Sequence, residues 1–166
     1  MAKTLDEVIF WARTVVGQQP WLRDPKCLPI PWRSVEVKKS LKIGVLWHDG
    51  LVTPTPPVSR ALNETVAKLK AAGHEVVTWA PTEHKRLLET LRTMFVADGG
   101  KSVRKLLEPT GEPFRPEMKM YETATELGVH EMWQVQVARN TLCKSYLDRW
   151  NEAGIDAVLC MVYHLL

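Results

Sequence analysis

The sequence predicts an α/β fold, because two apolar β-rich segments flank an amphipathic helical segment and a third apolar strand lies near residue 160. Residues 41–47 are apolar on both faces, as in a sheet strand that is covered on two sides. Residues 58–72 carry apolar side chains at helical spacing, and residues 74–79 form the next β-rich run. This order of strand, helix and strand predicts a βαβ unit with parallel strands.

The segment that precedes this unit has a different character. Thr4-Leu-Asp-Glu7 is a capping box, which predicts a helix that begins at Leu5 and ends at Gly17. Prolines interrupt the next segment so often that we expect a long connection without a helix or a central strand. The predicted organisation of residues 1–166 is a helix over 1–17, a proline-rich connection over 18–40 and an α/β portion over 41–166.

The α/β portion continues beyond the βαβ unit with further helices. Thr82 is expected to cap a helix, which Asp98-Gly-Gly100 then interrupts. The later elements are a short helix over 103–107, a loop over 108–116, a short helix over 117–127, a long helix over 130–152 and a buried strand over 155–160. The whole pattern corresponds to a partial mixed sheet with flanking helices.

Composition excludes several classes of protein. Net charge is only +3, and the tightest basic cluster, Lys38-Lys39 with Lys42, is too small to indicate a nucleic-acid partner. No apolar run approaches the roughly 20 residues of a membrane-spanning helix. The widely spaced cysteines favour reduced thiols in a cytoplasmic protein, and a homo-oligomer is one compatible assembly state.

No motif in the sequence supplies a complete catalytic or cofactor site. Gly99-Gly-Lys-Ser102 resembles the end of a phosphate-binding loop, but Phe95 stands where that motif requires a glycine. No serine lies in a Gly-x-Ser-x-Gly setting. We predict neither a metal nor a cofactor, because the histidines lack metal-ligand spacing and are expected at the surface. They are His48, His74, His84, His130 and His164.

Several segments, in order and at the right spacing, resemble the amidase signature family. The resemblance to its fungal acetamidase and fatty acid amide hydrolase members covers nearly the whole chain. Its main segments are Lys42-Ile-Gly-Val45, Asp49-Gly50, Pro54-x-Pro-Pro57-Val-x-Arg60-Ala-Leu62, Ala71-Ala-Gly-His-Glu-Val76, Phe95-x-Ala-Asp98-Gly-Gly100 and Asp156-Ala-Val-Leu-Cys160. Trp133, Arg139, Tyr146 and Trp150 also fit the family.

The resemblance implies part of an amidase signature fold in a serine hydrolase that cleaves carboxylic amides. Members use a lysine and two serines, one of them in a Gly-Gly-Ser-Ser-Gly loop, and no such stretch occurs here. We therefore assign no catalytic residue and expect an amidase fragment that is inactive alone. The alternative is a non-catalytic binding or regulatory module derived from an amidase. A nucleotide-binding α/β protein is disfavoured, because the glycine pattern fails.

The resemblance also implies one substrate-binding surface. In fatty acid amide hydrolases the helix before the Asp-Gly-Gly turn lines the acyl-chain channel, and the matching residues are Leu91, Met94 and Phe95. Their spacing places them on one helix face, as a channel wall requires. The same spacing would be found if that face only packed in the hydrophobic core. The family's proline after Cys160 is replaced by Met161 and a foreign tail to Leu166, which favours a truncated product over a dedicated subunit. We expect such a chain to be marginally stable or prone to aggregation.

Overall fold

The structure, a computed structural model, describes residues 2–36 and 38–161. The chain divides into two compact units, Met1–Lys39 and Ser40–Leu166. Within the described residues, no helix combines the length and the apolarity needed to cross a membrane. The predicted tail after Cys160 lies outside the described residues, apart from Met161.

The first unit consists of one capped helix and its connection. Helix α1 spans Leu5–Gly17, as predicted, and the capping box is present. The Thr4 hydroxyl oxygen accepts from the Glu7 N–H, and a Glu7 carboxylate oxygen accepts from the Thr4 N–H, each at 3.3 Å. A single 3-10 turn, Pro20–Leu22, departs from the expected irregular connection, because proline is well suited to the first position of a helical turn. The guanidinium of Arg13 lies 5.2 Å from the centroid of the Trp32 ring, so the connection folds back on α1.

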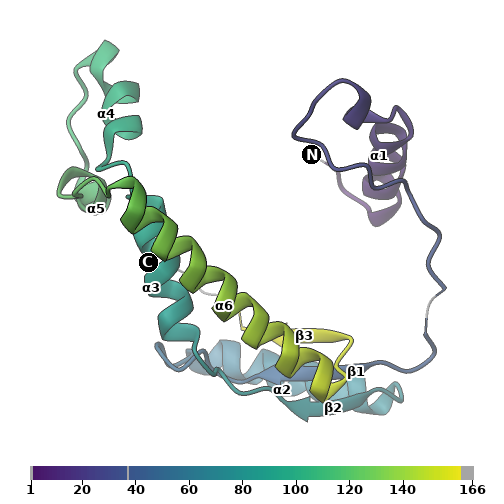
Figure 1. Cartoon of the computed structure of the whole chain (residues 1–166). Coiled ribbons are helices and arrows are strands. Elements are labelled where there is room, and N and C mark those ends of the chain that lie inside the picture. The colour runs from purple at the N-terminus through teal and green to yellow at the C-terminus, as the bar shows by residue number, and fades with distance from the viewer. Residues whose placement is uncertain (1, 37, 162–166) are drawn as a thin grey trace. The chain divides into compact units, whose positions relative to one another are not determined.

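The second unit is built on a parallel sheet (Figure 1). Strands β1 (Lys42–Leu46), β2 (Glu75–Thr78) and β3 (Ala157–Cys160) lie in the order β2-β1-β3. Both neighbours pair parallel with β1, and helix α2 (Pro56–Ala71) connects β1 to β2. The predicted βαβ unit and the α/β class are confirmed, and the strands that the structure describes are all parallel to one another.

Side chains cover both faces of the central strand. Val45 is fully buried against Leu62 and Val66 of α2. Its neighbour Leu46 points to the opposite face, as alternation along a strand requires, and packs with Trp79 and Ile155. Because β1 is apolar on both faces, it can occupy the centre of the sheet while helices cover each side.

The remaining helices extend from the sheet. Helix α3 (His84–Phe95) packs along the long helix α6 (Val129–Ala153), and Figure 1 shows them side by side. Along the chain, the segment that connects α3 to α6 contains α4 (Lys101–Leu107), the 3-10 turns Glu108–Thr110 and Pro116–Met118, and α5 (Lys119–Glu122). The helix expected over 117–127 is therefore only four residues of α-helix, with a 3-10 turn before it.

The predicted cap at Thr82 is wrong. The N-cap of α3 is Glu83, which has a left-handed backbone with φ of 64° and makes no side-chain capping bond. The chain turns at Glu83 because the neighbouring groups are held by α6. The carbonyl oxygen of Thr82 accepts a hydrogen bond from Arg149 at 3.1 Å, and the Glu83 carboxylate accepts one from Ser145 at 2.8 Å.

The predicted interruption at Asp98-Gly-Gly100 is confirmed. Gly99 and Gly100 have φ of +66° and +75°, values that favour glycine. A Cβ on Gly100 would overlap the carbonyl oxygen of Tyr121, so the turn needs glycine for space as well as for conformation. The turn thus separates α3, which ends at Phe95, from α4, which begins at Lys101.

Candidate functional site

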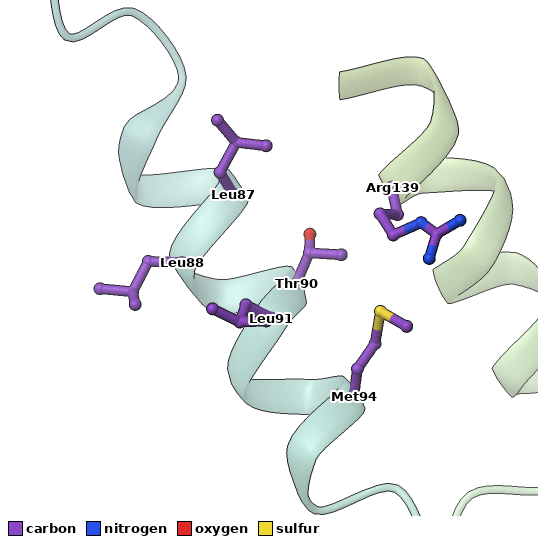
Figure 2. A pocket seen from close by; sticks show the side chains of 6 residues that line it. All are labelled: Leu87, Leu88, Thr90, Leu91, Met94 and Arg139. Carbon is purple, nitrogen blue, oxygen red and sulfur yellow. The ribbon is translucent and has the colours of Figure 1, made fainter. Parts of the chain in front are cut away.

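A groove lies between α3 and α6, with a volume of about 290 Å³ (Figure 2). One wall is apolar and comes from successive turns of α3. The other contribution comes from Arg139 on α6, which lies across the gap from Thr90 and Met94 in Figure 2, with its guanidinium turned back along α6. The lining residues are Leu87, Leu88, Thr90, Leu91, Met94 and Arg139.

Two of the three residues expected to bind substrate line this groove. Leu91 and Met94 belong to its wall, whereas Phe95 is not among the lining residues and is 59% exposed. Leu87 and Leu88 share the helical periodicity of Leu91, so that periodicity could have extended the prediction to them. Arg139 reaches the groove only through the packing of α6 on α3, and no local pattern indicates it. The substrate-binding role of Leu91, Met94 and Phe95 stays a prediction.

A second hollow, with a volume of about 420 Å³, lies where β1 and β3 end. It shares Leu87 and Leu88 with the α3 groove, so the two hollows meet along one helix. Ligands of α/β proteins commonly bind outside the carboxyl ends of parallel strands. The lining residues are Leu46, Asp49, Leu51, His84, Leu87, Leu88, Cys160 and Met161.

His84 is a titratable group of this hollow whose pKa is altered by its surroundings. Its ring stacks on Tyr146, with ring centroids 6.1 Å apart and planes 27° apart. Burial lowers the pKa of His84, the charge of Asp49 raises it, and the charge of Arg149 lowers it further. The net effect is a pKa below the ordinary value, so His84 is held neutral near pH 7.

The expectation of surface histidines is correct for His48 and His130 but not for His84. His74 is also half-buried, and its Nδ1 accepts a hydrogen bond from the Leu41 N–H at 3.2 Å. His164 lies outside the described residues. Throughout residues 2–36 and 38–161, no group of three or more His, Cys, Asp or Glu side chains could hold a metal ion.

An aromatic and cationic cluster fixes the start of α3 against α6. The guanidinium of Arg149 lies 5.3 Å from the ring centroid of Trp79 and 5.2 Å from that of Tyr146. The same side chain donates to the Thr82 carbonyl, while Ser145 holds Glu83. The strained backbone at Glu83 is therefore held from two sides, which positions the α3 wall of the groove.

The segment Gly99-Gly-Lys-Ser102 does not form a phosphate-binding loop. The Asp98 carboxylate accepts hydrogen bonds from the backbone N–H groups of Gly100 and Ser102, each at 2.8 Å. Hydrogen bonds from Ser102, and then from Gly100, lower the pKa of Asp98, so a negative charge of the protein itself occupies these amides. An anionic phosphate would be repelled at this turn.

The fold and the groove define an α/β protein with a sheet-edge hollow and an adjoining apolar channel-like surface. Residues 1–160 match the model of the Amidase family. The chain therefore belongs to the amidase family, and the resemblance drawn from the sequence is confirmed.

Individual relatives point the same way. The chain is 30% identical to "Amidase 1" of Gibberella moniliformis over 91% of this chain and 30% of that protein. It is 31% identical to an "Acetamidase" of Emericella nidulans over 96% of this chain and 32% of that protein. A solved structure titled "Fatty acid amide hydrolase" superposes with a TM-score of 0.90 and 34% identity, over 96% of this chain and 29% of that one. The chain thus spans about a third of the length of these relatives.

Proposed function

We propose that this chain is part of an amidase that cleaves carboxylic amides, and that the α3 groove holds the apolar part of a small amide substrate. The observation that carries the proposal is the alignment of Leu91 and Met94 on one wall of a groove, on the helix that the resemblance assigns to the acyl-chain channel. Helix positions one turn apart form a continuous apolar strip, which suits a ligand that is mostly hydrocarbon. The names of the relatives, which are amidases and an acetamidase, support the reaction class.

We propose further that these 166 residues alone do not hydrolyse amides. The sequence contains no Gly-Gly-Ser-Ser-Gly loop, and among the described residues no serine lines the groove or the sheet-edge hollow. Neither a cofactor nor a nucleic acid belongs to the proposed function. The cytoplasm is the compartment that we expect from the cysteine pattern.

Exposed apolar side chains favour a portion of a larger amidase over an independent regulatory module. Trp133 and Val137, one turn apart on α6, are 60% and 58% exposed, and Leu106 of α4 is 78% exposed. Covering such residues with another protein surface lowers the free energy by about 25 cal/mol per Å² of buried apolar area. A self-sufficient module would be expected to bury or replace them.

Ammonia release from acetamide and octanamide tests the inactivity of the chain. The purified chain is expected to release none above buffer, whereas an intact fungal acetamidase serves as the positive control. Turnover by the pure chain that a serine-directed fluorophosphonate abolishes would contradict the proposal.

Calorimetric titration with octanamide tests the groove. The proposal expects saturable binding that Leu91→Asp weakens about tenfold or more, because a carboxylate would interrupt the apolar wall. Leu147→Asp is the matched control, since Leu147 is also on the surface at 53% exposure and does not line the groove. Equal losses from both substitutions would show a nonspecific effect and remove the support for a channel.

A further inference from the structure

The loop that follows β1 contains Asp49-Gly50, one of two Asp-Gly dipeptides in the sequence. In such a dipeptide the backbone nitrogen of the glycine can attack the carboxyl carbon of the aspartate side chain, because glycine has no side chain to hinder the approach. The product is a five-membered succinimide ring, which water opens to aspartate or to isoaspartate. In a folded protein the reaction depends on which groups hold the glycine N–H and the carboxyl group.

The groups around Asp49 match the needs of this reaction. The Gly50 N–H donates a hydrogen bond to Nδ1 of His48 at 3.1 Å, so a base already contacts the proton that the attacking nitrogen must lose. Oδ1 of Asp49 accepts hydrogen bonds from the N–H groups of Leu51 and Val52, at 2.8 Å and 2.9 Å. Two donors on one oxygen stabilise the negative charge that develops there when the nitrogen attacks.

We infer that Asp49 is a site of spontaneous isomerisation to isoaspartate, with His48 as the base. In the acid form of Asp49, the bond from the Gly50 nitrogen to Cγ forms while the nitrogen gives its proton to Nδ1 of His48. The bond from Cγ to Oδ2 then breaks, and the hydroxyl leaves as water with the proton that the imidazole returns. The net change is the loss of one water. Gly50 is exposed, so solvent water reaches the ring and opens it at either carbonyl.

The second dipeptide, Asp98-Gly99, is held differently. The Gly99 N–H donates to the carbonyl oxygen of Val96 at 2.9 Å, and a carbonyl oxygen is not a base that takes up the proton. Both carboxylate oxygens of Asp98 accept hydrogen bonds from backbone N–H groups. A Cβ built on Gly99 would lie 2.9 Å from the Glu126 backbone nitrogen, so this glycine is closely packed against another segment. Attack by the Gly99 nitrogen requires these contacts to break, and Asp98 is therefore expected to be the slower site.

Isomerisation changes the sheet-edge hollow, because Asp49 lines it together with His84. Isoaspartate adds one carbon to the main chain at this position and moves the carboxylate relative to the end of β1. The reaction concerns the backbone of the chain itself and no substrate, so it is independent of the proposed function.

Peptide mapping of the purified chain tests the inference. The chain is incubated at mildly acidic pH and digested with trypsin, and a sample digested before incubation gives the background. The two dipeptides fall on separate peptides, residues 43–60 and 93–101. Mass spectrometry with electron-transfer fragmentation measures the loss of water and the isoaspartate in each peptide. We expect both products to accumulate at Asp49 at least about ten times faster than at Asp98, because a positioned base accelerates proton transfer.

His48→Gln keeps a hydrogen-bond acceptor but removes the base, and it is expected to slow the reaction at Asp49 about tenfold or more. His130→Gln, at another exposed histidine, is the matched control and should leave the rate unchanged. The chain unfolded in urea supplies a second measurement, in which the excess at Asp49 over Asp98 should shrink because the contacts that distinguish the two sites are lost. Equal rates at the two dipeptides in the folded chain, or an unchanged rate in His48→Gln, would overturn the inference.

Discussion

The indole nitrogen of Trp79 donates a hydrogen bond to the hydroxyl oxygen of Tyr146, 2.9 Å away. Trp79 directly follows β2 and is buried, whereas Tyr146 belongs to α6. The two rings also meet edge to face, with centroids 5.7 Å apart. This pair joins the sheet to the long helix, and through His84 and Arg149 it contacts the start of α3.

Tyr146→Phe is expected to lower the free energy of unfolding by about 1–2 kcal/mol, because it leaves the buried indole N–H of Trp79 without its acceptor. The ring contacts with Trp79 and His84 stay possible. Urea unfolding followed by tryptophan fluorescence measures the change. Tyr121→Phe is the control, since no hydrogen bond of the Tyr121 hydroxyl is found in the described part of the chain; an equal loss there would refute the assignment.

Gly100→Ala is expected to destabilise the chain by roughly 2 kcal/mol or more. The new Cβ would clash with the Tyr121 carbonyl oxygen, and alanine disfavours the positive φ of this position. Gly111→Ala is the matched control, with φ of +61° and open space around the new Cβ. It should cost only about 1 kcal/mol, from backbone strain alone. Thermal unfolding of both variants, compared with the parent chain, measures the difference, and equal effects would show that the contact with Tyr121 is unimportant.

Leu62→Ala is expected to cost about 2–5 kcal/mol, since Leu62 is 5% exposed and packs on Val45 at the centre of the sheet. Leu147→Ala, at a surface position that is 53% exposed, should stay within about 0.5 kcal/mol. Chemical denaturation of the two variants gives the comparison. A small effect at Leu62 would mean that α2 does not cover the sheet in solution as the structure has it.

His84 should make the stability of the chain depend on pH. Its folded-state pKa is lowered, chiefly by burial, so the unfolded chain binds the proton more readily than the folded chain does. Stability is therefore highest above the unfolded pKa and falls as the pH drops from about 7 to about 5. Asp49, Glu83 and Arg149 are the charged groups around His84, and Asp98 titrates below this range.

His84→Phe keeps an aromatic ring beside Tyr146 and removes the proton. Its free energy of unfolding should change less between pH 7 and about pH 5 than that of the parent chain. His130→Gln changes an exposed histidine and should leave the parent's pH dependence intact. Urea unfolding at both pH values measures each slope, and an unchanged slope in His84→Phe would exclude His84 as its source.

Local patterns in the sequence determine most of the secondary structure. The capping box at Thr4, the helical period from Val58 to Ala72 and the glycines after Asp98 each act over a few residues, and the structure contains the element that each predicts. The cap of α3 does not follow from such a pattern alone, because the left-handed Glu83 is held by Ser145 of α6 as well as by Arg86 of its own helix.

The site divides in the same way. The helical spacing on α3, together with the family resemblance, is enough to indicate Leu91 and Met94, since side chains one turn apart share a face. The position of Arg139 across from Met94, the burial of His84 and the bond between Trp79 and Tyr146 are decided only by tertiary packing. These residues lie far apart in sequence, and a periodic pattern determines which face a residue occupies on its own element but not which residue of another element it meets.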